Sequence, residues 1–363
     1  MNAGTTRRSC GIDSPAALEE TPTSPAATRP RRQGDVMPEP ARRRPPDRRR
    51  VVAAAALALL FLTSACKDPQ QVAAVAETGS QSAAALRDYY KTLSDDVETI
   101  LELESFLSAV RGVPFDSSSQ QLLADEIAAL DSRAKAADRL ASAYTALGTL
   151  AGTDAPEVAA TAGQNLATAV AGVTRMPSGV DPAPLFGSVV GDVTAAIESR
   201  ELGKANRALL SALSAAEQLF SRERDLYEGI VVERANKIEA VGELLLDQGL
   251  LDPSPLLQQL ATMTGLPLAA GAQPSDALRQ ALSALALAKT ERLGALTAAA
   301  AESLEATLLA QIQAQTALGE RRAPSLSQVN GALARATTLL DQIAAIKQEE
   351  EAAKAAAAAG GNP

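Results

Sequence analysis

Residues 83–111, AAALRDYYKTLSDDVETILELESFLSAVR, decide how this chain folds. Large apolar side chains recur there every three or four positions, which is the spacing of one face of an α-helix. The positions on that face are Leu86, Tyr90, Leu93, Val97, Ile100, Leu103, Leu107 and Val110. Gly112-Val113-Pro114 follows and favours the end of a helix. The sequence therefore predicts an amphipathic helix of about 30 residues.

The same spacing predicts further long helices joined by short loops along the rest of the chain. These are expected at about 118–150, 156–174, 256–264, 275–318 and 325–359. Asp116-Ser117-Ser118-Ser119 supplies capping side chains for the first of them. No proline follows Pro184 before Asp247, which allows either one helix of about 95 Å, bent near Gly203, or two stacked helices.

The composition supports an all-α fold. The chain is 46% apolar but only 2% aromatic, because Ala and Leu carry the apolar fraction, and these residues favour helix. Long helices with short connections bury their apolar faces only against one another. We therefore expect residues 83–359 to form an elongated antiparallel bundle of long, Ala/Leu-rich amphipathic helices, coiled-coil-like, with a disordered tail at 360–363.

The chemistry available to the chain is narrow. Its 363 residues include no His, which excludes Ser-His-Asp and Cys-His nucleophiles and His-ligated zinc. No phosphate-cradling glycine loop, nucleophile elbow or Cys/His metal spacing occurs either. We expect no enzyme activity, no cofactor and no metal.

The charges are distributed unevenly. Residues 1–50 carry eleven arginines and six acidic residues, and residues 51–66 carry no charge. Since the whole chain has 34 Lys and Arg against 43 Asp and Glu, 23 basic and 37 acidic residues remain, a net charge of −14. An acidic body argues against nucleic acid as a partner.

The basic head leads into a segment with the features of a cleavable signal peptide. Arg48-Arg49-Arg50 precedes the uncharged run 51–65, whose fifteen residues are fewer than the roughly 20 that span a bilayer. We assign residues 37–65 to this signal. Residues 1–36 are expected to be disordered or not translated, because a start at Met37 would give a signal of ordinary length.

The end of this segment, Leu62-Thr63-Ser64-Ala65-Cys66, resembles the lipobox of bacterial lipoprotein precursors, with Thr63 where Leu is commoner. The resemblance covers the signal alone. It implies cleavage between Ala65 and Cys66 and attachment of diacylglycerol to the Cys66 thiol, followed by a flexible tether over residues 66–82. The alternative is that Cys66 ends an uncleaved anchor.

Both interpretations put the body outside the cytoplasm, tied to a membrane. Lipoproteins of this kind that stay on the inner membrane tend to carry Asp after the Cys, whereas this chain has Lys67. The resemblance therefore implies the periplasmic face of the outer membrane in a cell with two membranes, or the outside of a cell with one. Loss of Cys10 with the leader would leave one cysteine and no internal disulfide.

One charged stretch, residues 221–228, is a candidate partner-binding site. The candidate residues are Arg222, Arg224 and Tyr227 within it and Phe220 directly before it, since exposed aromatic and arginine side chains favour interfaces. The alternative is structural: scarce aromatic residues usually enter cores, and Arg224–Glu228 and Glu233–Lys237 have the spacing of local ion pairs.

Three other features have structural and functional interpretations, and we favour the structural one for each. The acidic cluster on the first helix suits either a divalent cation or a solvated face; its residues are Asp95, Asp96, Glu98, Glu102 and Glu104. Phe115, Met176 and Phe186 are expected to plug the ends of the core instead of marking a pocket or membrane-touching tip. Gly229 and Gly242 suggest close helix packing, or hinges.

Two functional hypotheses remain. The first is a lipid-anchored, non-enzymatic scaffold, spacer or partner-binding module with an envelope protein as partner and an undetermined oligomeric state. The second is a helical protein that inserts into or remodels membranes. Its best apolar segments, 281–288 and 295–301, are interrupted by Lys289, Glu291 and Arg292.

Overall fold

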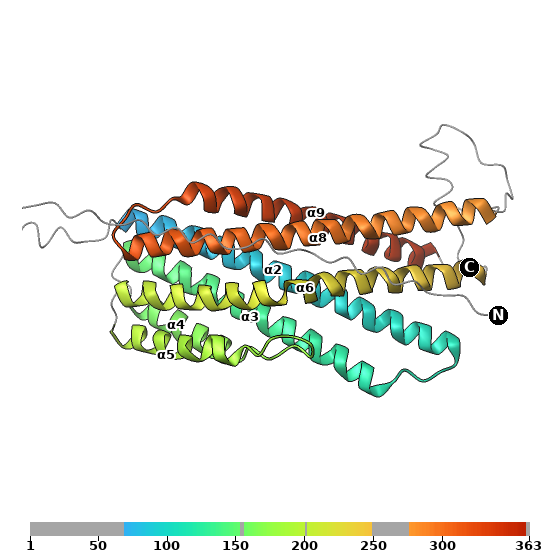
Figure 1. Ribbon diagram of the computed structural model, residues 1–363, viewed down its shortest axis with the longest axis horizontal. Coiled ribbons are helices and arrows are strands. Elements are labelled where there is room, and N and C mark those ends of the chain that lie inside the picture. The colour runs from blue at the N-terminus through green and yellow to red at the C-terminus, as the bar shows by residue number, and fades with distance from the viewer. Residues whose placement is uncertain (1–68, 153–155, 200–201, 249–275, 361–363) are drawn as a thin grey trace, which may run out of the picture. The chain divides into compact units, whose positions relative to one another are not determined.

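The computed structural model describes residues 69–152, 156–199, 202–248 and 276–360, all within the compact unit Thr63–Pro363. This part of the chain contains seven helices and no strand, so the predicted all-α class is confirmed. The helices are α2 (Pro69–Arg111), α3 (Ser117–Gly152), α4 (Pro156–Ala171), α5 (Ala183–Ser199), α6 (Leu202–Asp247), α8 (Asp276–Gly319) and α9 (Leu326–Gly360) (Figure 1). The predicted signal, Cys66 and the predicted helix at 256–264 lie outside the described residues.

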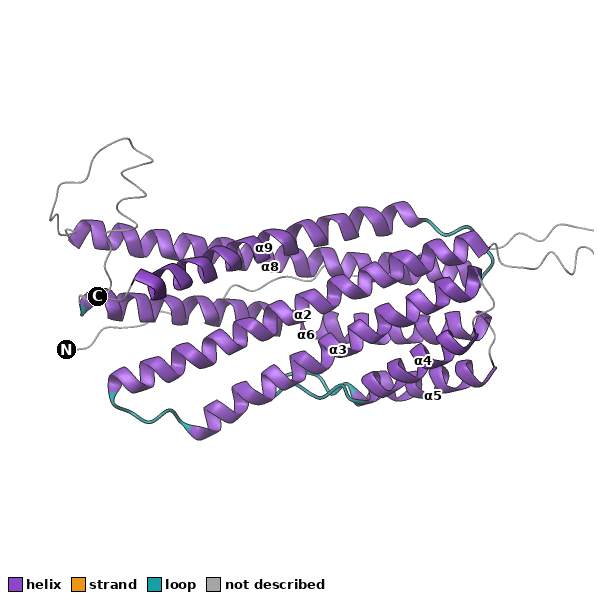
Figure 2. Ribbon diagram, turned by 180° about the vertical axis from the view of Figure 1, so that it is seen from behind, coloured by secondary structure: helices purple, strands orange, loops and turns teal. Residues whose placement is uncertain are grey.

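The helices pack side by side as a bundle with α2 at its centre. α2 contacts α3, α6, α8 and α9, while α4 and α5 cover α3 and α6. The pairs α2–α3 and α8–α9 are antiparallel hairpins with short turns (Figure 2). The start of α2 and the α8–α9 turn therefore share one end of the bundle, and the α2–α3 turn lies at the other.

The expected tether is wrong for residues 69–82, because α2 already begins at Pro69. Val72 and Val75 are fully buried within its first two turns, and Ser82 is buried one residue before the predicted start. Small residues recur at helical spacing in this segment and let it approach the neighbouring helices closely. Because they are not large apolar residues, the periodicity that predicts a helix is weak here. At Gly79 an added Cβ would lie 2.6 Å from the Tyr144 ring of α3.

Gly229 and Gly242 behave differently from Gly79. A Cβ added at either position would meet no atom within 4 Å. Close helix packing, which the sequence suggested for these two glycines, is therefore not the reason for them.

The turn between α2 and α3 follows the predicted capping chemistry. Gly112 adopts φ +66°, and the Val113 N–H donates to the Ser108 carbonyl at 3.0 Å, closing α2 in a Schellman-type turn. Asp116 then caps α3 by accepting from the Ser119 N–H at 3.1 Å. A backbone hydrogen bond thus ends one helix and a side-chain cap begins the next within five residues, 112–116.

Residues 183–247 form two helices, α5 and α6, which pack side by side instead of stacking end to end. Residues 200–201 between them lie outside the described part. The α4–α5 connection holds Met176, which is fully buried, and α5 holds Phe186, 6% exposed. Phe115 packs against the core from the α2–α3 turn. All three side chains thus pack into or against the core, as expected, but Met176 lies near Glu223, about midway along α6, and not at an end of the core.

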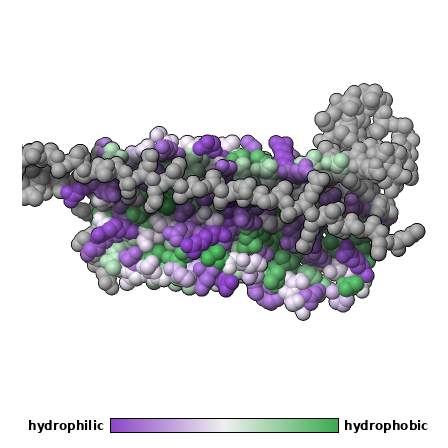
Figure 3. Space-filling view, in the orientation of Figure 1, coloured by the Kyte–Doolittle hydropathy of each residue, from purple (hydrophilic) through white to green (hydrophobic). Residues whose placement is uncertain are grey.

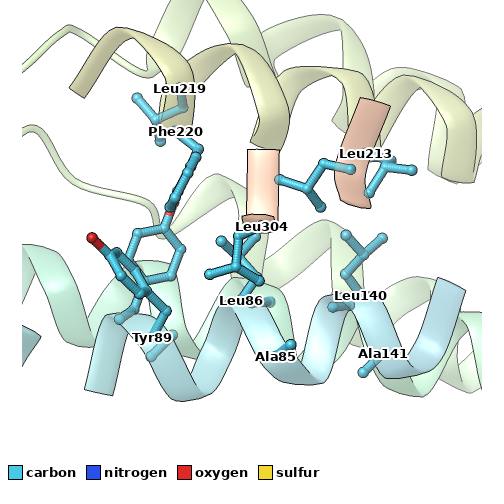
Figure 4. Close-up of a cluster of buried hydrophobic side chains, with 14 of the residues drawn as sticks. Ala85, Leu86, Tyr89, Leu140, Ala141, Leu213, Leu219, Phe220 and Leu304 are labelled. Carbon is cyan, nitrogen blue, oxygen red and sulfur yellow. The ribbon is translucent and has the colours of Figure 1, made fainter. Parts of the chain in front are cut away.

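An aromatic cluster fills the middle of the core, where α2 meets α6. Tyr89 and Tyr90 of α2 pack edge to face against Phe220 and Tyr227 of α6, with ring centroids 5.5 Å apart for Tyr89 and Phe220. Figure 4 shows Phe220 pointing across the interface toward Tyr89, with Leu304 of α8 beside Leu86. Four of the nine aromatic residues of the chain are spent here.

Candidate functional site

The structure separates the four candidate partner-binding residues. Phe220 and Tyr227 are both 0% exposed and belong to the aromatic cluster, so neither can offer its ring to a partner in this fold. Arg222 is exposed. Burial of both aromatic rings rules them out as a partner-binding surface and agrees with the structural alternative, that scarce aromatic residues enter the core. In an Ala-rich bundle the rings fill space that alanines cannot.

Arg224 forms ion pairs with Glu228 at 3.7 Å, as its spacing predicted, and with Glu305 of α8 at 3.0 Å. Ser221 also donates to Glu305, at 2.8 Å. The predicted Glu233–Lys237 pair does not form, since Lys237 pairs with Glu104 of α2. The charged stretch on α6 therefore ties that helix to its neighbours.

A fully buried ion pair, which the sequence did not reveal, joins α3 to α6. Arg133 donates from Nε to Glu223 Oε2 at 3.0 Å and from Nη2 to Oε1 at 2.9 Å. Both side chains are at most 1% exposed. The Tyr227 hydroxyl donates to the same carboxylate at 2.6 Å, and burial raises the pKa of Tyr227 well above its ordinary value. Tyr227 therefore stays a neutral donor.

The same pair holds the connection between α4 and α5. Arg133 Nη1 donates to the Thr174 carbonyl at 2.9 Å, and the Val180 N–H donates to Glu223 Oε1 at 3.2 Å. At Gly179 a Cβ would lie 2.5 Å from Glu223 Oε1, so only glycine lets the loop come this close. One ion pair thus positions two long helices and a loop.

A second network centres on Asp96 and links α2, α6, α8 and α9. Asp96 is 1% exposed, and its Oδ1 lies 2.7 Å from Lys347 Nζ and 3.1 Å from Arg234 Nε. Arg234 also forms an ion pair with Glu350 of α9 at 2.7 Å, and Glu350 in turn lies 3.6 Å from Lys289 of α8. Burial raises the pKa of Asp96, and the charges of Lys347 and Arg234 oppose that shift.

Asp96 corrects the expectation that the acidic cluster of α2 is a solvated face. Asp95, Glu98 and Glu102 are exposed as expected, but Asp96 points into the bundle and Glu104 pairs with Lys237. Within the described ranges no group of three or more His, Cys, Asp or Glu residues could hold a metal ion.

A layer of buried amides lies near the end of the bundle where α2 begins. Gln311 of α8 donates to the Val75 carbonyl at 2.8 Å and accepts from Thr78 at 2.9 Å. One turn further, Gln315 accepts from the Tyr144 hydroxyl at 2.6 Å and donates to the Asn206 carbonyl at 2.9 Å. These bonds set the register of α8 against α2, α3 and α6.

The cavity that the described residues enclose next to Arg133 is small. An apolar cavity of about 20 Å³ lies between α3, α4, α5 and α6, next to Tyr90, Leu166 and Phe186. This volume accepts about one water-sized sphere, far less than a small-molecule substrate needs. Two open grooves are larger: about 530 Å³ between α2 and α9, and about 520 Å³ between α3 and α4.

No protein-family model matches the chain, and neither a curated protein nor a solved structure is detectably similar to it. What the candidate site can do chemically is therefore inferred from its geometry alone. Its buried charges lie next to opposite charges across helix interfaces, although Asp96 Oδ1 and Oδ2 and Arg234 Nε form no hydrogen bond with any described residue. Such an arrangement specifies which helices pack together and in what register.

Proposed function

We propose that the protein is a lipid-anchored helical bundle of the cell envelope that acts as a scaffold, spacer or partner-binding module without catalytic chemistry. One observation carries the proposal: Arg48-Arg49-Arg50, the uncharged run 51–65 and Cys66 follow one another in the order of a lipoprotein signal. The thiol of Cys66 would carry the lipid, with the body in the periplasm, on the outer membrane, or outside a cell with one membrane.

The position of α2 supports an anchoring role for Cys66. Only two residues separate Cys66 from Pro69, where α2 begins, and three residue steps reach about 10 Å at most. An acylated Cys66 would hold the amide-layered end of the bundle against the bilayer. The opposite end, with the α2–α3 turn, would then be displayed away from the attachment point.

The use of buried charge supports a structural role over a catalytic one. Arg133 and Glu223 compensate each other, as do Asp96, Arg234 and Lys347, and the first pair is closed to solvent. A catalytic acid or base must reach its substrate. These groups reach only neighbouring helices.

Mass spectrometry of protein extracted from membranes tests the proposal. The expected N-terminal peptide begins at Cys66 and carries the mass of a diacylglycerol thioether. The Cys66→Ser variant is expected to accumulate uncleaved and without the added mass. An unmodified chain that begins near Met1 and is recovered from the cytosol would refute the anchor.

A second candidate function, membrane insertion, has one observation in its favour. Ala288–Gly319 of α8 is long and apolar enough to cross a membrane, with a hydropathy of 1.2, although 44% of its most apolar stretch is buried in the bundle. Insertion would break the hydrogen bonds of Gln311 and Gln315 to α2, α3 and α6. Leakage of dye from liposomes would favour this candidate over the scaffold.

A further inference from the structure

The free end of the α2–α3 hairpin exposes an apolar surface, which we call the apolar tip. It consists of Phe106 and Val110 on α2, Val113 in the turn and Leu122 on α3, with exposures of 39%, 39%, 60% and 51%. These are four of the seven large apolar side chains exposed in the described residues. Figure 3 shows green surface at this end, at the lower right. Clustered exposed apolar residues mark interaction sites, whereas single ones are ordinary.

Buried side chains and hydrogen bonds hold the backbone of the apolar tip in place. Leu107 and Leu123, one residue along each helix, are 3% and 8% exposed, and Phe115 packs against the core from the turn. The Schellman-type turn at Gly112 and the Asp116 cap fix the backbone between the two helices. Lys237 of α6 pairs with Glu104 just below the tip. The surface is therefore preorganised, which lowers the cost of binding.

The apolar tip also lies far from the proposed anchor. α2 has 43 residues, so its two ends are about 64 Å apart at 1.5 Å per residue. Under the proposed function, on which this inference rests, the tip is the part displayed to the surroundings.

The charges around the apolar tip discriminate between occupants. Among the described residues of α2, α3 and the turn between them, Glu102, Asp116 and Asp125 are exposed at its rim, against one exposed cation, Arg111. An anionic bilayer favours Lys and Arg around an inserted apolar face, so it suits this rim poorly. A second copy would bring two acidic rims together, which repel each other.

We infer that the apolar tip docks an envelope protein whose apolar patch is bordered by Lys and Arg residues. The apolar side chains supply the buried centre of such an interface, and the serines at 117–119 with Gln121 supply an uncharged polar border. The acidic residues attract the partner and exclude surfaces of like charge.

Site-specific photocrosslinking of the full chain in intact cells tests the inference. A photoreactive residue in place of Val113 should give an adduct with one other protein. The same residue in place of Leu309, which is 42% exposed on α8, should not. The crosslinked protein is then identified and purified, and its affinity for the lipidated protein is measured by titration.

Matched variants decide whether the apolar tip is responsible. Phe106→Ser with Leu122→Ser should weaken binding by about tenfold or more, whereas Val232→Ser with Leu309→Ser should not change it. Added salt should weaken binding, and Glu102→Lys should weaken it further. Circular dichroism melting curves confirm that each variant folds.

Four results would overturn the inference: an adduct of twice the chain's mass, an adduct with lipid, a crosslink within the chain, or no adduct above the Leu309 control. The state of Cys66 is read separately from its N-terminal peptide. An adduct at the apolar tip of a chain whose Cys66 is not acylated would refute the lipid anchor and leave the docking surface standing. An acylated chain without an adduct would refute the docking surface and leave the anchor standing.

Discussion

Arg133 of α3 and Glu223 of α6 meet inside the bundle through two parallel hydrogen bonds of 3.0 Å and 2.9 Å, 90 residues apart in the chain. Removal of two charges from water costs several kcal/mol per ion, and only good geometry with further hydrogen bonds offsets that cost. Here Tyr227, Val180 and the Thr174 carbonyl supply those bonds. The pair therefore fixes the positions of α3, α6 and the α4–α5 loop relative to one another.

Loss of one partner should be worse than loss of both charges. Arg133→Met is expected to lower the free energy of unfolding by about 3–5 kcal/mol, because it leaves a buried carboxylate uncompensated. Arg133→Met with Glu223→Gln should lose less, because the introduced amide is neutral; its oxygen can accept from the Val180 N–H, and its NH2 can donate to the Tyr227 hydroxyl oxygen. Urea unfolding curves of the three proteins measure the difference. A double variant less stable than Arg133→Met alone would contradict this role of the pair.

Two glycines should respond in opposite directions to alanine. At Gly79 the new Cβ would lie 2.6 Å from the Tyr144 ring, so Gly79→Ala should destabilise the protein by about 1–3 kcal/mol. At Gly229 no atom lies within 4 Å, so Gly229→Ala should stabilise it by about 0.5–1 kcal/mol through its helix propensity. Thermal unfolding compares the two. Equal effects would mean that α2 and α3 are not closely packed at Gly79.

The helices and helix ends that depend on the local pattern of residues could be predicted from the sequence. The expected helices at 118–150, 275–318 and 325–359 agree with α3, α8 and α9 to within two residues at each end. The Asp116 cap and the end of α2 were read correctly from short motifs. Large apolar side chains at helical spacing and capping residues suffice for such elements, because both act within a few residues of the chain.

Features that depend on distant partners were missed. Asp96 was placed on a solvated face because its neighbours in the sequence are acidic, while Arg234 and Lys347 are far along the chain. One signal was present: Arg133 and Glu223 each occupy an apolar face, with Leu130 and Ala137 around the first and Phe220 and Tyr227 around the second. The start of α2 was missed because Gly, Ala and Ser bury little apolar area.

An acidic residue facing another acid should make stability depend on pH. Burial, and to a lesser extent the charge of Glu233 on α6, raise the pKa of Glu126 on α3 above its ordinary 4.5. The folded protein therefore holds this proton more tightly than the unfolded chain. The contribution of Glu126 to stability is largest at low pH and falls as pH rises through the range above 4.5.

Glu126→Gln should remove this dependence. The variant is expected to gain about 0.5 kcal/mol at neutral pH, and the gain should vanish in acid where Glu126 is protonated. Asp125→Asn, a change at the exposed neighbouring position, is the control and should stay within about 0.5 kcal/mol of wild type. Denaturant titrations at several pH values separate the two, and a gain that is independent of pH would contradict the assigned cause.

The contact of Lys347 with Asp96 should hold the last turns of α9 against the bundle. Lys347 lies 2.7 Å from the buried carboxylate and also donates to the Thr92 carbonyl at 2.8 Å, so Lys347→Met leaves Asp96 with only Arg234. The expected loss in the free energy of unfolding is about 1–3 kcal/mol at neutral pH.

Because the Lys347→Met variant raises the folded-state pKa of Asp96 further, this loss of stability should grow with rising pH and shrink in acid. Amide hydrogen exchange should also accelerate in α9 near Ile343 and Ile346 before it does in α3 or α6. Arg335→Met, which removes an exposed cation from the same helix, should change neither stability nor exchange; similar behaviour of the two variants would show that α9 is held by its apolar face alone.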